Sequence, residues 1–172
     1  MNLYLLRHGI AVPDDDPENM PDSDRPLSAK GIKRMRKAAK GMRRLGIPFD
    51  GVLTSPFVRA RQMAEIVAQA LGLADHLEDL STLAPGNPVS DLWSSLAPFE
   101  NREHVLLVGH EPFLSATLGY LLTHDEKRSV TVDFKKGGLC RVEIDALPPN
   151  KAGTLHWLLT PKQLRTLAAS SQ

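Results

Sequence analysis

Cysteine is nearly absent from this sequence, with Cys140 as its single instance among 172 residues. A lone cysteine excludes an intrachain disulfide framework and fits a reducing cytoplasm. The formal net charge is only +1, so general electrostatic attraction to nucleic acid or to membranes does not explain the function. No apolar stretch approaches the ~20 residues of a membrane span, and residues 1–12 lack the pattern of a signal peptide. We therefore expect a cytoplasmic protein.

Closely spaced clusters of histidine, cysteine and carboxylate side chains are also missing, so the sequence predicts no metal site and no cofactor. What is present is the composition of a folded protein, with 42% hydrophobic and 24% charged residues. A chain of this length and composition fits one compact domain with a sizeable core. No internal repeat or linker interrupts it, and we expect a single domain over residues 1–172.

Short apolar runs alternate with helical patterns along the chain. The run at 3–6 reads as a buried strand, and Ser28 is a suitable N-cap for a helix that Gly46 ends. The same reasoning predicts strands at 51–55, 105–108, 130–134, 139–144 and 154–159, and helices at 56–71, 89–96, 112–122 and from 161 onward. The runs at 130–134 and 139–144 flank a turn and predict an antiparallel hairpin. The fold class is therefore α/β, a three-layer αβα sandwich whose central sheet is mostly parallel with an antiparallel edge strand.

Polar residues follow three of the predicted strands where each one ends. Arg7 and His8 come after the first strand, Arg59 lies shortly after the second, and His110 follows a later one. Because the carboxyl ends of parallel strands meet at one edge of a sheet, we expect these side chains to lie close together. Two arginines can hold a tetrahedral dianion by bidentate hydrogen bonds, and two imidazoles beside them can attack it or donate to it. The pattern therefore predicts phosphate chemistry.

Three motifs at these positions resemble the histidine phosphatase superfamily, whose fold is shared with phosphoglycerate mutases: LRHG at 6–9, SPFVRARQ at 55–62 and VGHEP at 108–112. The resemblance implies that His8 is the nucleophile that receives the phosphoryl group. It also implies that Arg7 and Arg59 hold the phosphoryl oxygens and that His110 completes the pocket. A histidine with a pKa near ~6.5 is largely neutral at pH 7 and presents a ring nitrogen for in-line attack. Water would then release phosphate without a metal or another cofactor.

RPLSAKG at 25–31, the short chain and WLLTPKQL at 157–164 resemble the bacterial phosphohistidine phosphatases within that superfamily. Many relatives place a glutamate after the second helix to protonate the leaving oxygen, whereas the matching segment LSTLAPG carries Thr82. The carboxylates that could replace it are Glu78, Asp79 and Glu111. Because an alkoxide leaves poorly without an acid and imidazole leaves easily, this gap favours phosphohistidine over alkyl phosphate esters.

Little chain is left beyond the core fold for a lid, so the predicted pocket is open, with 13–27 and 83–92 at its rim. The expected partner is a phosphorylated protein, and a small phosphate monoester is the alternative substrate. A non-catalytic module that binds phosphorylated or acidic partners is the alternative of another class. The helix at 28–46 carries basic residues and no acidic one, which suits docking of an acidic partner or of nucleic acid. A solvated helix face is favoured over both, since no aromatic residue accompanies the basic ones for base stacking.

Overall fold

A mixed sheet forms the centre of the computed structural model, which describes residues 1–15, 20–125, 128 and 130–169. The strands are β1 (Asn2–Arg7), β2 (Gly51–Thr54), β3 (Leu77–Asp79), β4 (His104–Gly109), β5 (Leu139–Glu143) and β6 (Thr154–Leu159). Their order across the sheet is β3, β2, β4, β1, β5, β6. β1 to β4 run parallel to one another, whereas β5 runs antiparallel to both of its neighbours, β1 and β6.

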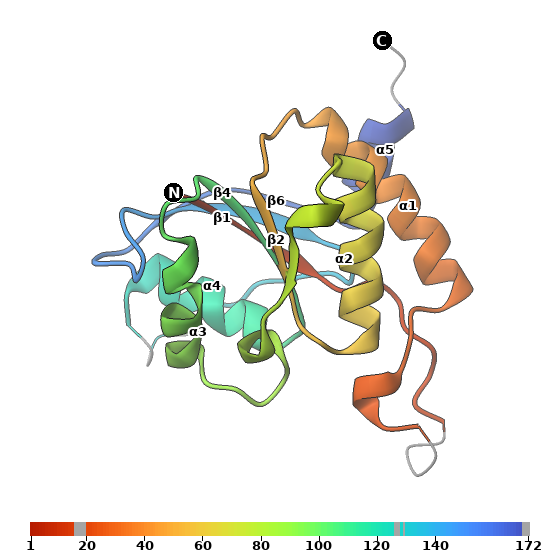
Figure 1. The fold of residues 1–172 in the computed structure, drawn as a ribbon, viewed down its shortest axis with the longest axis horizontal. Coiled ribbons are helices and arrows are strands. Elements are labelled where there is room, and N and C mark those ends of the chain that lie inside the picture. Colours follow the sequence, from red (N-terminus) through yellow and green to blue (C-terminus); the bar gives the residue numbers. More distant parts are fainter. Residues whose placement is uncertain (16–19, 126–127, 129, 170–172) are drawn as a thin grey trace.

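Helices cover both faces of this sheet (Figure 1). The α-helices are α1 (Ala29–Arg44), α2 (Val58–Leu71), α3 (Val89–Leu96), α4 (Phe113–Thr123) and α5 (Pro161–Ala169). The chain also contains four short 3-10 helices: η1 (Asp22–Asp24), η2 (Ala74–His76), η3 (Ser81–Leu83) and η4 (Ala97–Phe99). α1, α2 and α5 lie on one face, and α3 and α4 lie on the other (Figure 1). Within the described ranges, no helix has both the length and the apolar character to cross a membrane.

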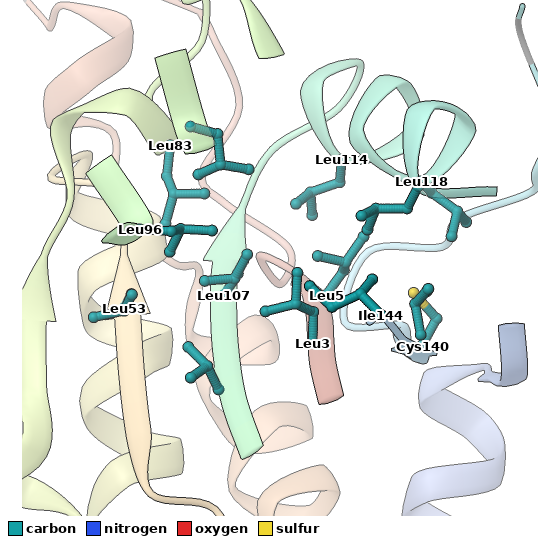
Figure 2. Packing of buried hydrophobic residues seen from close by; sticks show 14 of the residues in the cluster. Leu3, Leu5, Leu53, Leu83, Leu96, Leu107, Leu114, Leu118, Cys140 and Ile144 are labelled. Carbon is teal, nitrogen blue, oxygen red and sulfur yellow. The ribbon is translucent and has the colours of Figure 1, made fainter. Parts of the chain in front are cut away.

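Successive residues of the central strands point to opposite faces and build two separate cores. In β1, Leu3 and Leu5 belong to the core under α3 and α4, where Figure 2 shows them facing the same region as Leu114. Tyr4 and Leu6 belong to the core under α1 and α2. All four β1 side chains are fully buried, and burial of one leucine side chain is worth about 2 kcal/mol. β1 is thus fixed from both faces, which positions the residues at its end.

Two glycines allow α1 to approach its neighbours closely. A Cβ atom on Gly31 would overlap the carbonyl oxygen of Ile10, and one on Gly41 would overlap the carbonyl oxygen of Leu164 in α5. The predicted N-cap is confirmed, because Oγ of Ser28 accepts from the N–H of Gly31 at 3.0 Å and donates to the Ile10 carbonyl at 3.1 Å. These contacts hold the start of α1 against the chain that leaves β1.

The predicted α/β fold class is confirmed, whereas three details of the sheet differ from the prediction. The antiparallel strand, β5, lies next to the edge strand β6 and not at the edge itself. The strand predicted at 130–134 is wrong, and the hairpin is instead formed by β5 and β6. Both edges of β5 are occupied, by β1 and β6, so 130–134 has no edge of β5 to join, and Phe134 is buried in the core. The sequence also does not predict β3, because its three residues are half-buried or exposed and show no apolar pattern.

Candidate active site

The carboxyl ends of β1, β4 and β2 lie together because these strands are neighbours in the parallel part of the sheet. The N–H of His8 donates to the Gly109 carbonyl at 2.9 Å, and the N–H of Ser55 donates to the Val108 carbonyl at 3.0 Å. The segments that follow the three strands therefore start at one edge of the sheet. The structure brings together there the residues that the motifs predict: Arg7, His8, Arg59 and His110.

The two imidazole rings of this site are buried and close to each other. The ring centroids of His8 and His110 are 4.9 Å apart, and the two residues are 7% and 1% exposed. Nδ1 of His8 lies 2.7 Å from the carbonyl oxygen of Gly9. Because a carbonyl oxygen only accepts, this hydrogen bond places the proton of the neutral ring on Nδ1 and the lone pair on Nε2. The ring of His8 therefore offers Nε2 as a nucleophile.

His110 is oriented by a serine at the end of β2. Its Nε2 atom lies 2.9 Å from Oγ of Ser55, and the same Oγ accepts from the backbone N–H of Phe57 at 3.3 Å. The Nδ1 atom of His110 is buried and has no hydrogen-bond partner among the described residues. A buried polar atom of this kind costs free energy unless it is paired, so Nδ1 is suited to contact a ligand.

The two guanidinium groups are held by separate segments of the chain. Nη1 of Arg7 donates to the carbonyl oxygen of Phe134 at 2.6 Å, and its Nε is buried without a partner in the described part of the chain. Arg59 is 5% exposed, with its Cζ atom 5.1 Å from the centroid of the Phe57 ring. Its Nη2 lies 2.8 Å from Oδ2 of Asp22, and its Nη1 donates to the backbone carbonyl of the same aspartate.

Asp22 is the residue of this site that the sequence does not reveal. It lies 37 residues before Arg59, in the segment 13–27, which the sequence predicts only to lie at the pocket rim. Partial burial raises the pKa of Asp22, but the hydrogen bond from Arg59 and the charges of Arg59 and Arg25 outweigh it, so the pKa lies below its ordinary value. Asp22 is therefore a carboxylate at neutral pH.

Burial keeps both histidines neutral at pH 7. Burial, assisted by the charges of Arg59 and Arg7, lowers the pKa of His8 to about 4. Burial, followed by the charges of His8 and Arg59, lowers the pKa of His110 to about 3. The site thus combines two neutral imidazoles with two permanently charged guanidinium groups, an arrangement that can bind a tetrahedral dianion and attack it.

The carboxylates considered as replacements for a general acid are engaged in other contacts. Asp79 and Glu78 form ion pairs with arginines at 2.8 Å and 3.3 Å. Oε2 of Glu111 accepts from a serine hydroxyl of α4 at 2.6 Å, whereas its Oε1 is buried without a partner among the described residues. Thr82 lies in η3, and its Oγ1 is buried without a partner among the described residues. In the same part of the chain, no group of three or more His, Cys, Asp or Glu side chains is placed to hold a metal ion.

Comparison with known proteins identifies the family. Residues 3–84 match the model of the histidine phosphatase superfamily (branch 1). Phosphohistidine phosphatase SixA of Escherichia coli K12 is 29% identical over 171 residues, which cover 98% of this chain and 99% of that protein. The chain belongs to the histidine phosphatase superfamily.

One further related sequence and one related structure agree with this assignment. An uncharacterized protein of Picosynechococcus sp. is 41% identical over 116 residues, which cover 66% of this chain and 68% of that protein. The structure of the protein histidine phosphatase SixA complexed with tungstate matches with a TM-score of 0.80 and 28% identity, over 95% of this chain and 99% of that one. The resemblance that the motifs indicate, to this superfamily and to its SixA branch, is confirmed.

Proposed function

We propose that this protein is a phosphatase that removes the phosphoryl group from phosphohistidine on a partner protein, through a covalent intermediate on His8. The observation that carries the proposal is the hydrogen bond from Nδ1 of His8 to the carbonyl of Gly9, because it leaves Nε2 as the nucleophile. Arg7, Arg59 and His110 surround this nucleophile and supply donors for the phosphoryl oxygens. Similarity to SixA of Escherichia coli, which is named for phosphohistidine hydrolysis, supports the substrate class.

The proposed reaction consists of two in-line displacements. In the first, Nε2 of His8 forms a bond to phosphorus while the bond between phosphorus and the imidazole nitrogen of the substrate breaks. A phosphohistidine that carries a proton on its second ring nitrogen leaves as neutral imidazole. In the second, a water oxygen forms a bond to phosphorus while the bond between phosphorus and Nε2 of His8 breaks. A water proton passes to solvent or phosphate, orthophosphate is released, and His8 returns to its neutral form. Arg7 and Arg59 offset the negative charge on the equatorial oxygens in both steps.

Thr82 supports phosphohistidine over alkyl phosphate esters as the substrate. A threonine hydroxyl is too weak an acid to protonate a leaving alkoxide. Asp79 and Glu78 are paired with arginines, and Oε2 of Glu111 is held by a serine hydroxyl. We infer further that no metal is needed, since the two guanidinium groups can offset the charge that develops on the phosphoryl oxygens. We also infer a cytoplasmic reaction, since a lone buried thiol such as Cys140 is usual in that compartment.

Rapid quenching of the protein with a peptide that carries labelled phosphohistidine tests the mechanism. We expect a base-stable, acid-labile phosphoenzyme whose label maps to His8, and we expect His8→Ala to form none. His156→Ala is the matched control, because this partly exposed histidine pairs with Glu143 away from the site. A label on another residue, or unchanged turnover in His8→Ala, would contradict the covalent mechanism. A higher kcat/KM for alkyl phosphate esters than for phosphohistidine would overturn the substrate class.

A further inference from the structure

A groove lined by cationic side chains begins beside the candidate active site. Its lining includes Gly9, which follows the nucleophile His8, and its volume is about 290 Å³. The cations come from α1, from the turn before β5 and from α5: Arg34, Lys135, Lys136, Lys162 and Arg165. No acidic residue is among the described residues that line it. We call these five side chains and the surface between them the basic groove.

The positive charge of the basic groove is largely uncompensated. Lys135 pairs with Asp133 at 2.7 Å, whereas the described part of the chain provides no ion pair for the other four cations. By contrast, Arg59 and Arg61 near the start of α2 each pair with a carboxylate. The chain as a whole carries a net charge of only +1. The positive charge of the groove therefore comes from the clustering of basic side chains there and not from an excess of basic residues in the whole chain.

The turn before β5 connects the basic groove to the nucleophile. The N–H of Gly137 donates to the carbonyls of Arg7 and His8, at 2.9 Å and 3.2 Å. The Phe134 carbonyl accepts from the Arg7 guanidinium. The charge of Lys136 also contributes to lowering the pKa of His8, after burial and the two arginines. A polypeptide that presents a phosphorylated side chain to His8 can therefore continue into the groove.

We propose that the basic groove binds an acidic segment of the phosphorylated partner protein, beside the phosphohistidine that enters the active site. This inference rests on the function proposed above and specifies the partner. Ile10 and Pro161 lie among the cations, are half-buried, and offer apolar surface for the residues between the acidic ones. No aromatic side chain is among the lining residues, so bases have no stacking platform, and this favours a protein over nucleic acid. Complementary charge of this kind raises association rates and selects partners.

Charge reversal on α5 tests the groove without changing the residues around His8. The double variant Lys162→Glu/Arg165→Glu is compared with Lys33→Glu/Lys37→Glu, which makes the same charge change on exposed residues of α1 that do not line the groove. The substrates are a phosphohistidine peptide with Asp and Glu on both sides, the same peptide with Asn and Gln instead, and free phosphohistidine. Thermal unfolding of each variant verifies that it is folded.

We expect the groove variant to lose about 10-fold in kcat/KM for the acidic peptide and the control variant to change little. Turnover of free phosphohistidine should be equal in all three proteins, and the wild-type preference for the acidic peptide should decrease in high salt. Equal losses in both variants, or no loss in the groove variant, would overturn the groove assignment. If the wild type hydrolyses neither peptide nor free phosphohistidine, the proposed function fails instead.

Calorimetry measures binding of the unphosphorylated acidic peptide to the wild type and to the groove variant. It distinguishes failure of the groove assignment from failure of the proposed function. This measurement needs no turnover, so it tests the groove alone. Weaker binding by the groove variant than by the Lys33→Glu/Lys37→Glu control supports the inference. Identical binding by the two variants, or tighter binding of a single-stranded oligonucleotide than of the acidic peptide to the wild type, would contradict it.

Discussion

The carboxylate of Asp22 lies 2.8 Å from Nη2 of Arg59, and the backbone carbonyl of the same aspartate accepts from Nη1. The guanidinium that we propose to hold the phosphoryl group is therefore partly neutralised by an anion of its own chain. The side chain of Arg59 is 6% exposed, whereas that of Asp22 is 49% exposed. A phosphoryl dianion bound at Arg59 is repelled by the negative charge of Asp22. Because the Asp22 carboxylate is near solvent, it can turn away from the ligand, whereas the buried guanidinium of Arg59 stays in place.

Removal of the Asp22 charge is therefore expected to strengthen anion binding. We expect Asp22→Asn to lower the Kd for orthophosphate about fivefold, since a like charge no longer opposes the ligand at Arg59. Isothermal titration calorimetry measures this affinity. Asp24→Asn, a change of the same charge in the same 3-10 helix, should leave the Kd unchanged. Weaker phosphate binding by Asp22→Asn would show that the aspartate orients Arg59 rather than opposing the ligand.

Installation of a carboxylic acid at residue 82 should change substrate preference. We expect Thr82→Glu to raise kcat for an alkyl phosphate ester about 10-fold, because general acid catalysis is worth most for a poor leaving group. Turnover of phosphohistidine should change little. Thr82→Gln has a similar size but no acid and should show no gain. Steady-state kinetics measure kcat on both substrates. An increase in kcat for the ester in Thr82→Gln equal to that in Thr82→Glu would contradict the role of the acid.

The site was predictable from sequence because its signals are local. The run of β1 ends directly in Arg7 and His8, and parallel neighbours bring the ends of β2 and β4 to the same edge. The pairing of Asp22 with Arg59 was not predictable, since nothing near Asp22 in the sequence distinguishes it from other acidic residues of its loop. The position of that loop depends on packing between distant segments, which periodicity does not describe.

The error at 130–134 has a similar origin. The alternation of VTVDF is typical of a strand, but a strand also needs a free edge to pair with, and β5 already has β1 and β6 as neighbours. The segment is instead held in place by the burial of the Phe134 side chain and by the hydrogen bond that the Phe134 carbonyl accepts from Arg7. β3 shows the converse case, since its three residues form a strand only because β2 offers an open edge.

The hydrogen bond between Ser55 and His110 should matter for the rate more than for substrate binding. We expect Ser55→Ala to lower kcat about 10-fold with little change in KM, because the hydroxyl fixes the ring orientation of His110. Nitrogen chemical shifts of His110 should also change, which a loss of stability alone would not cause. Ser94→Ala removes a serine hydroxyl bonded to the Asp91 carbonyl on α3 and serves as the control. Unaltered kcat in Ser55→Ala would exclude this positioning role.

Burial of neutral His8 should make stability depend on pH in a defined range. Its pKa is about 4 in the folded protein against an ordinary value of 6.5, so the unfolded state binds more protons between these values. The free energy of unfolding should therefore be unaffected by this group above pH 6.5 and should fall as the pH falls toward 4. A pKa difference of about two and a half units corresponds to about 3 kcal/mol.

Replacement of His8 by a residue that does not titrate isolates this contribution, because the carboxylates titrate in both proteins. We expect the loss of stability between pH 7 and pH 4 to be smaller in His8→Asn than in the wild type by up to about 3 kcal/mol. Urea denaturation at a series of pH values measures it. His76→Asn, at an exposed histidine in η2, should keep the wild-type dependence. Identical pH dependence in the wild type and His8→Asn would mean that His8 is not held neutral, and the lone pair assigned to its Nε2 would then lack support.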